Sequence, residues 1–149
     1  MKNILTTCLF LCLLLTVHAA DNPNVKKLFT VTSGELKLTF MVGTDDRLYQ
    51  LGFGDATREV EPPAKMPSRE FLPPYGNGVL TEPAIQATHV DGNTSTELHY
   101  AGHRTEALAP GIEQTVISLK DPAYPFTVDI YIKCYTDNSM MEIWNTVTH

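Results

Sequence analysis

Alternating apolar and polar residues predict most of the chain as β-strands. The clearest run is PFTVDIYIKCYT, in which every second residue from Phe126 to Cys134 is apolar and the residues between are polar or tyrosine. A period of two is that of a strand with one buried face. The pattern therefore predicts a half-buried strand whose inner row ends in a core thiol, Cys134.

A second region predicts a hairpin. ELKLTFMV (35–42) places Leu36, Leu38, Phe40 and Val42 on one face, and RLYQLGF (47–53) returns after the turn Gly43-Thr44-Asp45-Asp46. Two alternating runs joined by a short polar connection are typical of antiparallel neighbours.

Weaker alternation fills the rest of the chain. EQTVISLK (113–120) predicts a strand, and AIQATHV (84–90) is predicted to pair with TSTELHYAGH (94–103) across the turn Asp91-Gly92-Asn93. SMMEIWNTVTH (139–149) alternates as a half-buried strand, whereas no stretch of ten residues has a helical period. We therefore expect an all-β, antiparallel domain, most simply a β-sandwich.

The first residues predict a leader. Residues 1–19 carry Lys2, an apolar stretch and the ending Val17-His18-Ala19, which is the layout of a signal peptide. An uncleaved anchor is the alternative, but a membrane-spanning helix needs about 20 apolar residues. We expect export to the periplasm or the exterior, with a mature chain of residues 20–149 that is not held in a membrane.

Charge and cysteine count exclude two classes of protein. The 149 residues contain 11 Lys and Arg against 17 Asp and Glu, a net charge of −6, so nucleic acid is not an expected partner. Of the three cysteines, Cys8 and Cys12 fall in the leader, which leaves Cys134 without a partner. A disulfide framework is excluded.

Residues 54–83 break the strand pattern. Six prolines and three glycines there disfavour ladder hydrogen bonds and helices alike, so we expect a long loop. Unstructured loops of about thirty residues are usually functional or disordered. Its apolar residues favour packing against the domain: Phe71, Leu72, Tyr75, Val79 and Leu80.

Three histidines raise the question of a metal site. His89, His99 and His103 fall on the predicted 84–103 hairpin, and a spacing of four places His99 and His103 on one side of a strand. No cysteine or well-placed carboxylate completes a zinc-like set, so ordinary surface histidines are the favoured interpretation, with no metal or cofactor expected.

Other motifs predict little chemistry. YGNG (75–78) lacks the strand-to-helix context of a phosphate loop and reads as a turn. Asn93-Thr94-Ser95 matches the glycosylation pattern but also suits a hairpin tip. The loop carboxylates are most simply solvated charges: Asp55, Glu59, Glu61, Glu70 and Glu82.

Several stretches, in order along the chain, resemble the N-terminal domain of the bacterial α-galactosidases of glycoside hydrolase family 36. They are DRLYQLGFG (46–54), PPYGNG (73–78), EPAIQATHVDGNTSTELHY (82–100), TVISLKDPAYPFTVDIYIKCY (115–135) and MEIWNTVTH (141–149). The resemblance implies that residues 20–149 are part of a β-supersandwich domain.

The resemblance also implies what the chain does not contain. Family members carry two catalytic aspartates on a (β/α)₈ barrel and hydrolyse terminal α-galactosides with retention. A barrel needs about 250 residues, so we expect no catalytic residue here and interpret the chain as an N-terminal, non-catalytic fragment that is inactive alone. The parent is expected to be a homo-oligomer that acts on α-galactoside oligosaccharides.

Loops of this domain reach a neighbouring subunit's substrate pocket in family oligomers. By that resemblance, the substrate-proximal candidates in the 54–83 loop are Asp55, Arg69, Glu70 and Tyr75.

Two alternatives remain at this point. One is a secreted, non-catalytic β-sandwich that binds carbohydrate or protein, using ring surfaces from Tyr49, Tyr75, Tyr100, Tyr131 and Trp144. The other is a sugar epimerase of related supersandwich architecture, which the order of the matching stretches disfavours.

Overall fold

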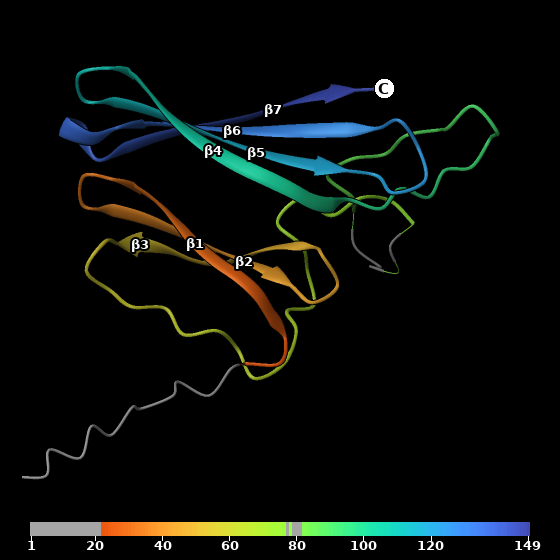
Figure 1. Cartoon of the computed structure of the whole chain (residues 1–149), viewed down its shortest axis with the longest axis horizontal. Coiled ribbons are helices and arrows are strands. Elements are labelled where there is room, and N and C mark those ends of the chain that lie inside the picture. Colours follow the sequence, from red (N-terminus) through yellow and green to blue (C-terminus); the bar gives the residue numbers. More distant parts are fainter. Residues whose placement is uncertain (1–21, 77, 79–81) are drawn as a thin grey trace, which may run out of the picture.

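Two antiparallel β-sheets lie face to face in the computed structural model, which describes residues 22–76, 78 and 82–149 (Figure 1). The predicted leader, with its two cysteines, lies outside the described residues, as do Val79 and Leu80. The first sheet has the order β1 (Val25–Ser33), β2 (Leu36–Gly43), β3 (Leu48–Asp55). The second has the order β4 (His99–Ala109), β5 (Ile112–Lys120), β6 (Thr127–Tyr135), β7 (Met140–Thr148), with a 3₁₀ turn, Thr136–Asn138, before β7. The predicted all-β sandwich is confirmed.

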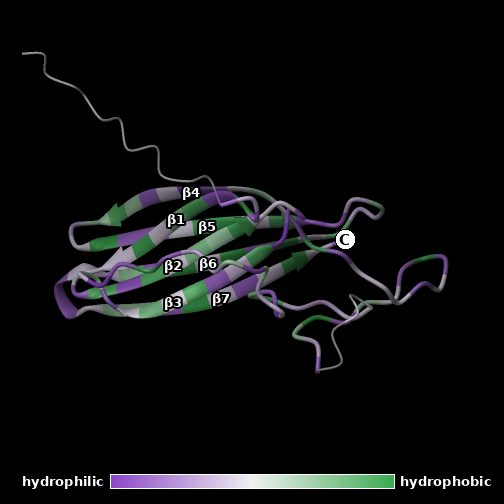
Figure 2. Cartoon of the chain, turned by 90° about the horizontal axis from the view of Figure 1, so that it is seen from below, coloured by the Kyte–Doolittle hydropathy of each residue, from purple (hydrophilic) through white to green (hydrophobic). Residues whose placement is uncertain are grey.

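The core lies between the sheets and is built from the predicted alternating rows. Along β6, Val128, Ile130, Ile132 and Cys134 are each at most 2% exposed, and they face apolar residues of β2. Figure 2 shows the alternation of hydrophobic and hydrophilic residues along the strands. Cys134 is a buried free thiol, as predicted, and burial raises its pKa.

The predicted hairpin of residues 35–53 is confirmed as β2 and β3, but β2 is buried on both faces. Met41, which points away from the core row, is fully buried, and Thr39 on the same side is 6% exposed. The start of the long loop covers this outer face. Amides of Asn22 and Asn24 hold the loop by donating to the carbonyls of Pro63 and Ala64, each at 3.0 Å.

The predicted pairing of 84–90 with 94–103 is wrong. Residues 84–98 form no ladder, and β4 pairs with β5 instead. Only the predicted turn at 91–93 is confirmed. His89 N donates to the Asn93 carbonyl at 2.8 Å, and Gly92 has a positive φ of 84°, which a glycine tolerates. The backbone groups of this segment are satisfied elsewhere, since Ala84 N donates to Pro73 O and Thr96 N to Tyr75 O.

The predicted strand at residues 139–147 is confirmed as β7, but it is less buried than its pattern suggests. It pairs with β6 over nine residues without a bulge. The three-stranded sheet does not cover it, so Ile143 and Val147, on its inner side, are 48% and 47% exposed. Among the described residues, no helix is long or apolar enough to span a membrane.

Candidate functional site

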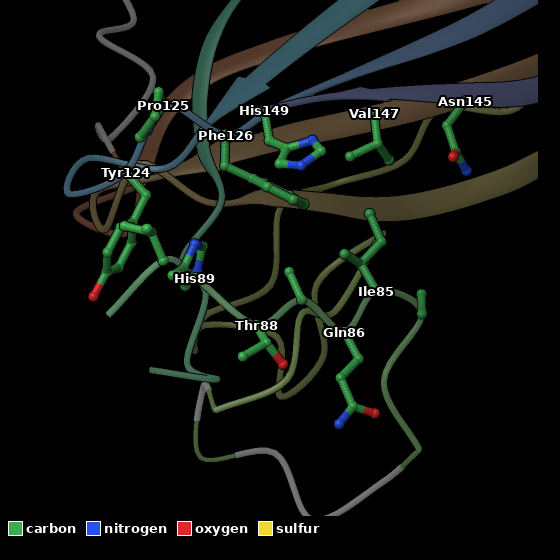
Figure 3. Close-up of a pocket in the computed structure, with 13 residues that line it drawn as sticks. Ile85, Gln86, Thr88, His89, Tyr124, Pro125, Phe126, Asn145, Val147 and His149 are labelled. Carbon is green, nitrogen blue, oxygen red and sulfur yellow. The ribbon is translucent and has the colours of Figure 1, made fainter. Parts of the chain in front are cut away.

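A pocket of about 600 Å³ lies at one end of the sandwich, beside the inner side of β7 (Figure 3). Its size is within the range of small-ligand sites. Three segments line it: the irregular stretch 84–90, the β5–β6 connection at 124–126, and the end of β7 with His149. Phe126, Val147 and Ile85 supply apolar surface, and the Asn145 amide adds a polar group.

The wall formed by His89 and Tyr124 is held in place by stacking and hydrogen bonds. Their rings are parallel within 5° with centroids 3.7 Å apart. His89 Nε2 lies 3.1 Å from Thr96 Oγ1, and the Tyr124 hydroxyl donates to Asp91 Oδ2 at 2.9 Å. The hydrogen bonds that Asp91 accepts from the Asn93 backbone and from Tyr124 lower the pKa of Asp91. The wall is therefore fixed before any ligand binds.

A buried carboxylate, Asp121, ties the two irregular segments together. It is 8% exposed, and its oxygens accept from the backbone N–H groups of Ala123 (2.8 Å) and Tyr124 (3.0 Å) in its own turn. It also accepts from Glu97 N at 2.9 Å, just before β4. These charge-assisted hydrogen bonds fix the position of the pocket wall on the sheet.

The pocket does not carry the carboxyl groups that glycoside hydrolysis requires. Within the described part of the chain, no Asp or Glu is among its lining residues, and its titratable side chains are His89, Tyr124 and His149. An apolar surface with a few amide and imidazole groups can hold a ligand, but it offers no pair of carboxyl groups for glycoside hydrolysis.

The structure does not gather the four loop candidates into one site. Asp55 ends β3, where Thr57 N and Oγ1 donate to its carboxylate at 2.7 and 2.6 Å and lower its pKa. Arg69 and Glu70 lie near the opposite end of β3, because Phe71 N donates to Leu48 O. Strand geometry separates these two ends of β3 by about 20 Å.

Glu70 and Tyr75 differ in exposure. Glu70 is 6% exposed and forms an ion pair with Arg47 Nη1 at 3.3 Å, so it braces the first sheet. Tyr75 is 44% exposed, and its backbone pairs with Ile85 and Thr96. Tyr75 therefore belongs to the side of the molecule that carries the pocket, whereas Asp55 belongs to the far end of β3.

The predicted common side for His99 and His103 is wrong. A bulge between Tyr100 and Gly102 reverses the facing, because His99 pairs with Lys120 and His103 with Ile117, three residues apart on β5. No group of three or more potential metal ligands occurs among residues 22–76, 78 and 82–149.

Sequence patterns did not reveal the pocket residues as a set. Tyr124 and Phe126 follow a proline-containing turn, and Asn145 interrupts the apolar row of β7. Asn145, a polar residue in an apolar row, was the one sequence signal for the pocket. No local sequence pattern predicts that residues 84–90 lie beside β7.

Comparison with known proteins defines the family. Residues 42–149 match the Glycosyl hydrolase family 36 N-terminal domain. No match was found among curated proteins.

Solved structures share the fold at low sequence identity. The GH36 α-galactosidase AgaB from Geobacillus stearothermophilus matches with 19% identity and a TM-score of 0.70 over 83% of this chain and 21% of its own. The α-galactosidase from Lactobacillus brevis matches with 16% identity and a TM-score of 0.66, over 81% and 21%.

A third match is the galactosidase domain of the α-galactosidase–sucrose kinase AgaSK, at 15% identity and a TM-score of 0.71, over 82% of this chain and 22% of that one. The chain thus spans about a fifth of the length of these structures. Since the family match covers most of the chain, this protein belongs to glycosyl hydrolase family 36 through its N-terminal domain.

Proposed function

We propose that the chain is the non-catalytic N-terminal portion of an exported α-galactosidase that hydrolyses terminal α-galactosides with retention of configuration. The observation that carries the proposal is the family match over residues 42–149. The coverage of the solved relatives supports it, since their remaining four-fifths has no counterpart here. Structures of variants of AgaA, a GH36 α-galactosidase from Geobacillus stearothermophilus that is 20–21% identical to this chain, hold raffinose and stachyose, so we assign α-galactoside oligosaccharides to the parent as substrates.

The carboxylates of this chain support the non-catalytic role. Retaining hydrolysis needs two carboxyl groups about 5 to 5.5 Å apart beside the glycosidic bond. Glu70 is buried against Arg47, and Asp55 is bound by Thr57 in its own turn. Neither Asp55 nor Glu70 is among the residues that line the pocket of Figure 3.

A further part of the proposal concerns the loop after β3. In the oligomeric parent, Asp55 lies beside a neighbouring subunit's substrate, whereas Arg69 and Tyr75 lie away from Asp55 and do not share that site, and Glu70 acts as a brace. Polar groups surround Asp55 in a shallow pocket of about 360 Å³ that includes Lys37, Arg58 and Glu59, and such groups suit sugar hydroxyls. Alanine at Asp55 should raise the parent's KM or lower its kcat, and unchanged constants would assign this rim to packing alone.

Export is proposed from the leader pattern of residues 1–19. N-terminal sequencing of protein secreted by an expressing cell should find Ala20 or Asp21 first. Recovery of Lys2 in that material would contradict export through a cleaved leader.

The test of the function is the stereochemistry of the parent's reaction. Proton NMR should show α-galactose as the first product from a nitrophenyl α-galactoside, followed by slow mutarotation. A β-anomer as first product, or no action on α-galactosides, would overturn the proposal.

A further inference from the structure

The outer face of the four-stranded sheet carries a stacked aromatic pair outside the pocket of Figure 3. Tyr131 on β6 and Trp144 on β7 are directly opposite each other in the ladder. Their rings are parallel within 5°, with centroids 5.2 Å apart. Trp144 is 40% exposed, whereas the neighbouring Asn145 and Val147 point to the pocket on the other side of the sheet. Tyr131 supports one side of Trp144, and solvent reaches the indole.

The pair rests on a rigid base. Val116 is opposite Tyr131 on β5 and is 1% exposed, although no second sheet formed by the described residues covers this face. The side chains of its cross-strand neighbours, Tyr131 among them, must therefore cover Val116. The β6–β7 ladder runs through nine pairs without a bulge, so the two rings are held in one register.

Polar pairs stand on either side of the two rings. Toward one end lie Asp129 and Thr146, and toward the other lie Lys133 and Glu142. The Asp129 carboxylate accepts from Ser118 Oγ at 2.5 Å.

Tyr135 contacts both members of the second pair. Glu142 accepts from the Tyr135 hydroxyl at 2.9 Å, and Lys133 Nζ lies 5.0 Å from the Tyr135 ring. Each charge beside Trp144 therefore has a local partner on the sheet. The surface offers hydrogen-bonding groups without a strong charge of one sign, which disfavours a charged ligand.

From this arrangement we propose that Trp144, supported by Tyr131, is the platform of a non-catalytic binding site for a pyranose ring of a neutral oligosaccharide. A flat indole packs against the C–H face of such a ring, and the carboxylates and hydroxyls on both sides accept and donate to its hydroxyl groups. An apolar protein partner would need apolar surface beyond the two rings, whereas the flanking positions are polar. The site is independent of the parent's hydrolytic activity.

The composition of the chain makes a direct test available. Trp144 is its only tryptophan, so tryptophan emission reports on this site alone. Titration of the full chain with stachyose should shift the emission saturably, and glycerol at equal hydroxyl concentration should not. An emission spectrum that does not change with stachyose would overturn the proposal.

Variants identify the platform residue. By saturation-transfer NMR of stachyose, Trp144→Ala should lower the affinity about tenfold and Tyr131→Ala should lower it less, since the support is lost but the indole remains. Trp144→Phe should retain part of the affinity, which separates loss of the ring from misfolding. Leu28→Ala is the matched control, because Leu28 is a 44% exposed apolar residue on β1 of the other sheet. Equal affinity in wild type and Trp144→Ala, or an equal loss in Leu28→Ala, would contradict the assignment.

Discussion

Strands β6 and β7 are neighbours with the same alternation of residues between the two faces of the sheet. The inner face of β6 is buried, whereas that of β7 is half exposed. The inner row of β6, represented by Ile130 at 2% exposure, lies under the first sheet. On β7, Ile143 occupies the same inner face and is 48% exposed, because no strand of the three-stranded sheet lies over it. Alternation therefore determines which way a side chain points, whereas the second layer determines how much that side chain stabilises the fold.

The largest expected difference is in the free energy of unfolding. Ile130→Ala removes buried atoms and leaves a cavity, so it should cost about 3 kcal/mol. Ile143→Ala removes half-exposed atoms and should cost less than about 1 kcal/mol. Urea unfolding of both variants measures this difference, and equal losses would contradict the proposed lack of cover over β7.

The free edge of β7 should make the 149-residue chain self-associate. Strand β7 contains no proline, lysine or arginine, and on its inner face Ile143 and Val147 are 48% and 47% exposed. Unprotected edges of this kind pair with other chains. Sedimentation velocity should show species larger than a monomer, and Val147→Lys should reduce them without lowering stability. A wild-type chain that is monomeric at high concentration would argue against this role of the edge.

The rate at which a thiol reagent reacts distinguishes the buried inner face of β6 from the exposed inner face of β7. Cys134 is 2% exposed and burial raises its pKa, so a thiol reagent should modify it slowly in the folded chain. With Cys8 and Cys12 replaced by serine, an Ile143→Cys variant should react at one site many times faster than at Cys134. Similar rates at the two positions would show that β6 and β7 are equally accessible.

The smallest expected effect is a pH dependence at His103, where β4 meets β1. Burial is the larger cause that lowers the pKa of His103, and the Lys27 ammonium is the smaller one. The His103 ring stacks on the Phe29 ring with centroids 4.0 Å apart. The unfolded chain therefore takes up this proton at a higher pH than the folded chain. The contribution of His103 to stability is present above its ordinary pKa near 6.5 and is lost as pH falls through the lowered value.

Urea midpoints at pH 7.5 and pH 5 measure this effect. His103→Phe keeps a ring against Phe29 and should flatten the acid side of the profile. An unchanged profile in that variant would assign the pH dependence to other groups.

Local pattern was sufficient to predict the central strands. The row from Phe126 to Cys134 and the β2–β3 hairpin needed only alternation and turn residues, and both are present. Strand β1 was missed because Lys26 and Lys27 disrupt its pattern and only Val31 and Ser33 on it are buried.

The regions around the candidate sites depend on long-range contacts. Residues 84–98 alternate like a hairpin, yet their backbone groups bond to Pro73, Tyr75 and Asp121. One extra residue at the β4 bulge places His99 and His103 on opposite faces of the sheet. Neither the bulge nor the path of the long loop has a strong local signal, so the pocket and the true facing of the histidines were not predictable from the sequence.

The most direct test of the central claim is an activity assay of the 149-residue chain itself. We predict no hydrolysis of a chromogenic α-galactoside above the rate in buffer, because among the described residues no Asp or Glu carboxylate lines the pocket of Figure 3 and Asp55 and Glu70 are engaged by Thr57 and Arg47. The same assay with Asp55→Asn and Glu70→Gln variants provides the control for contaminating enzyme. Turnover by the purified chain that either substitution abolishes would contradict the non-catalytic role.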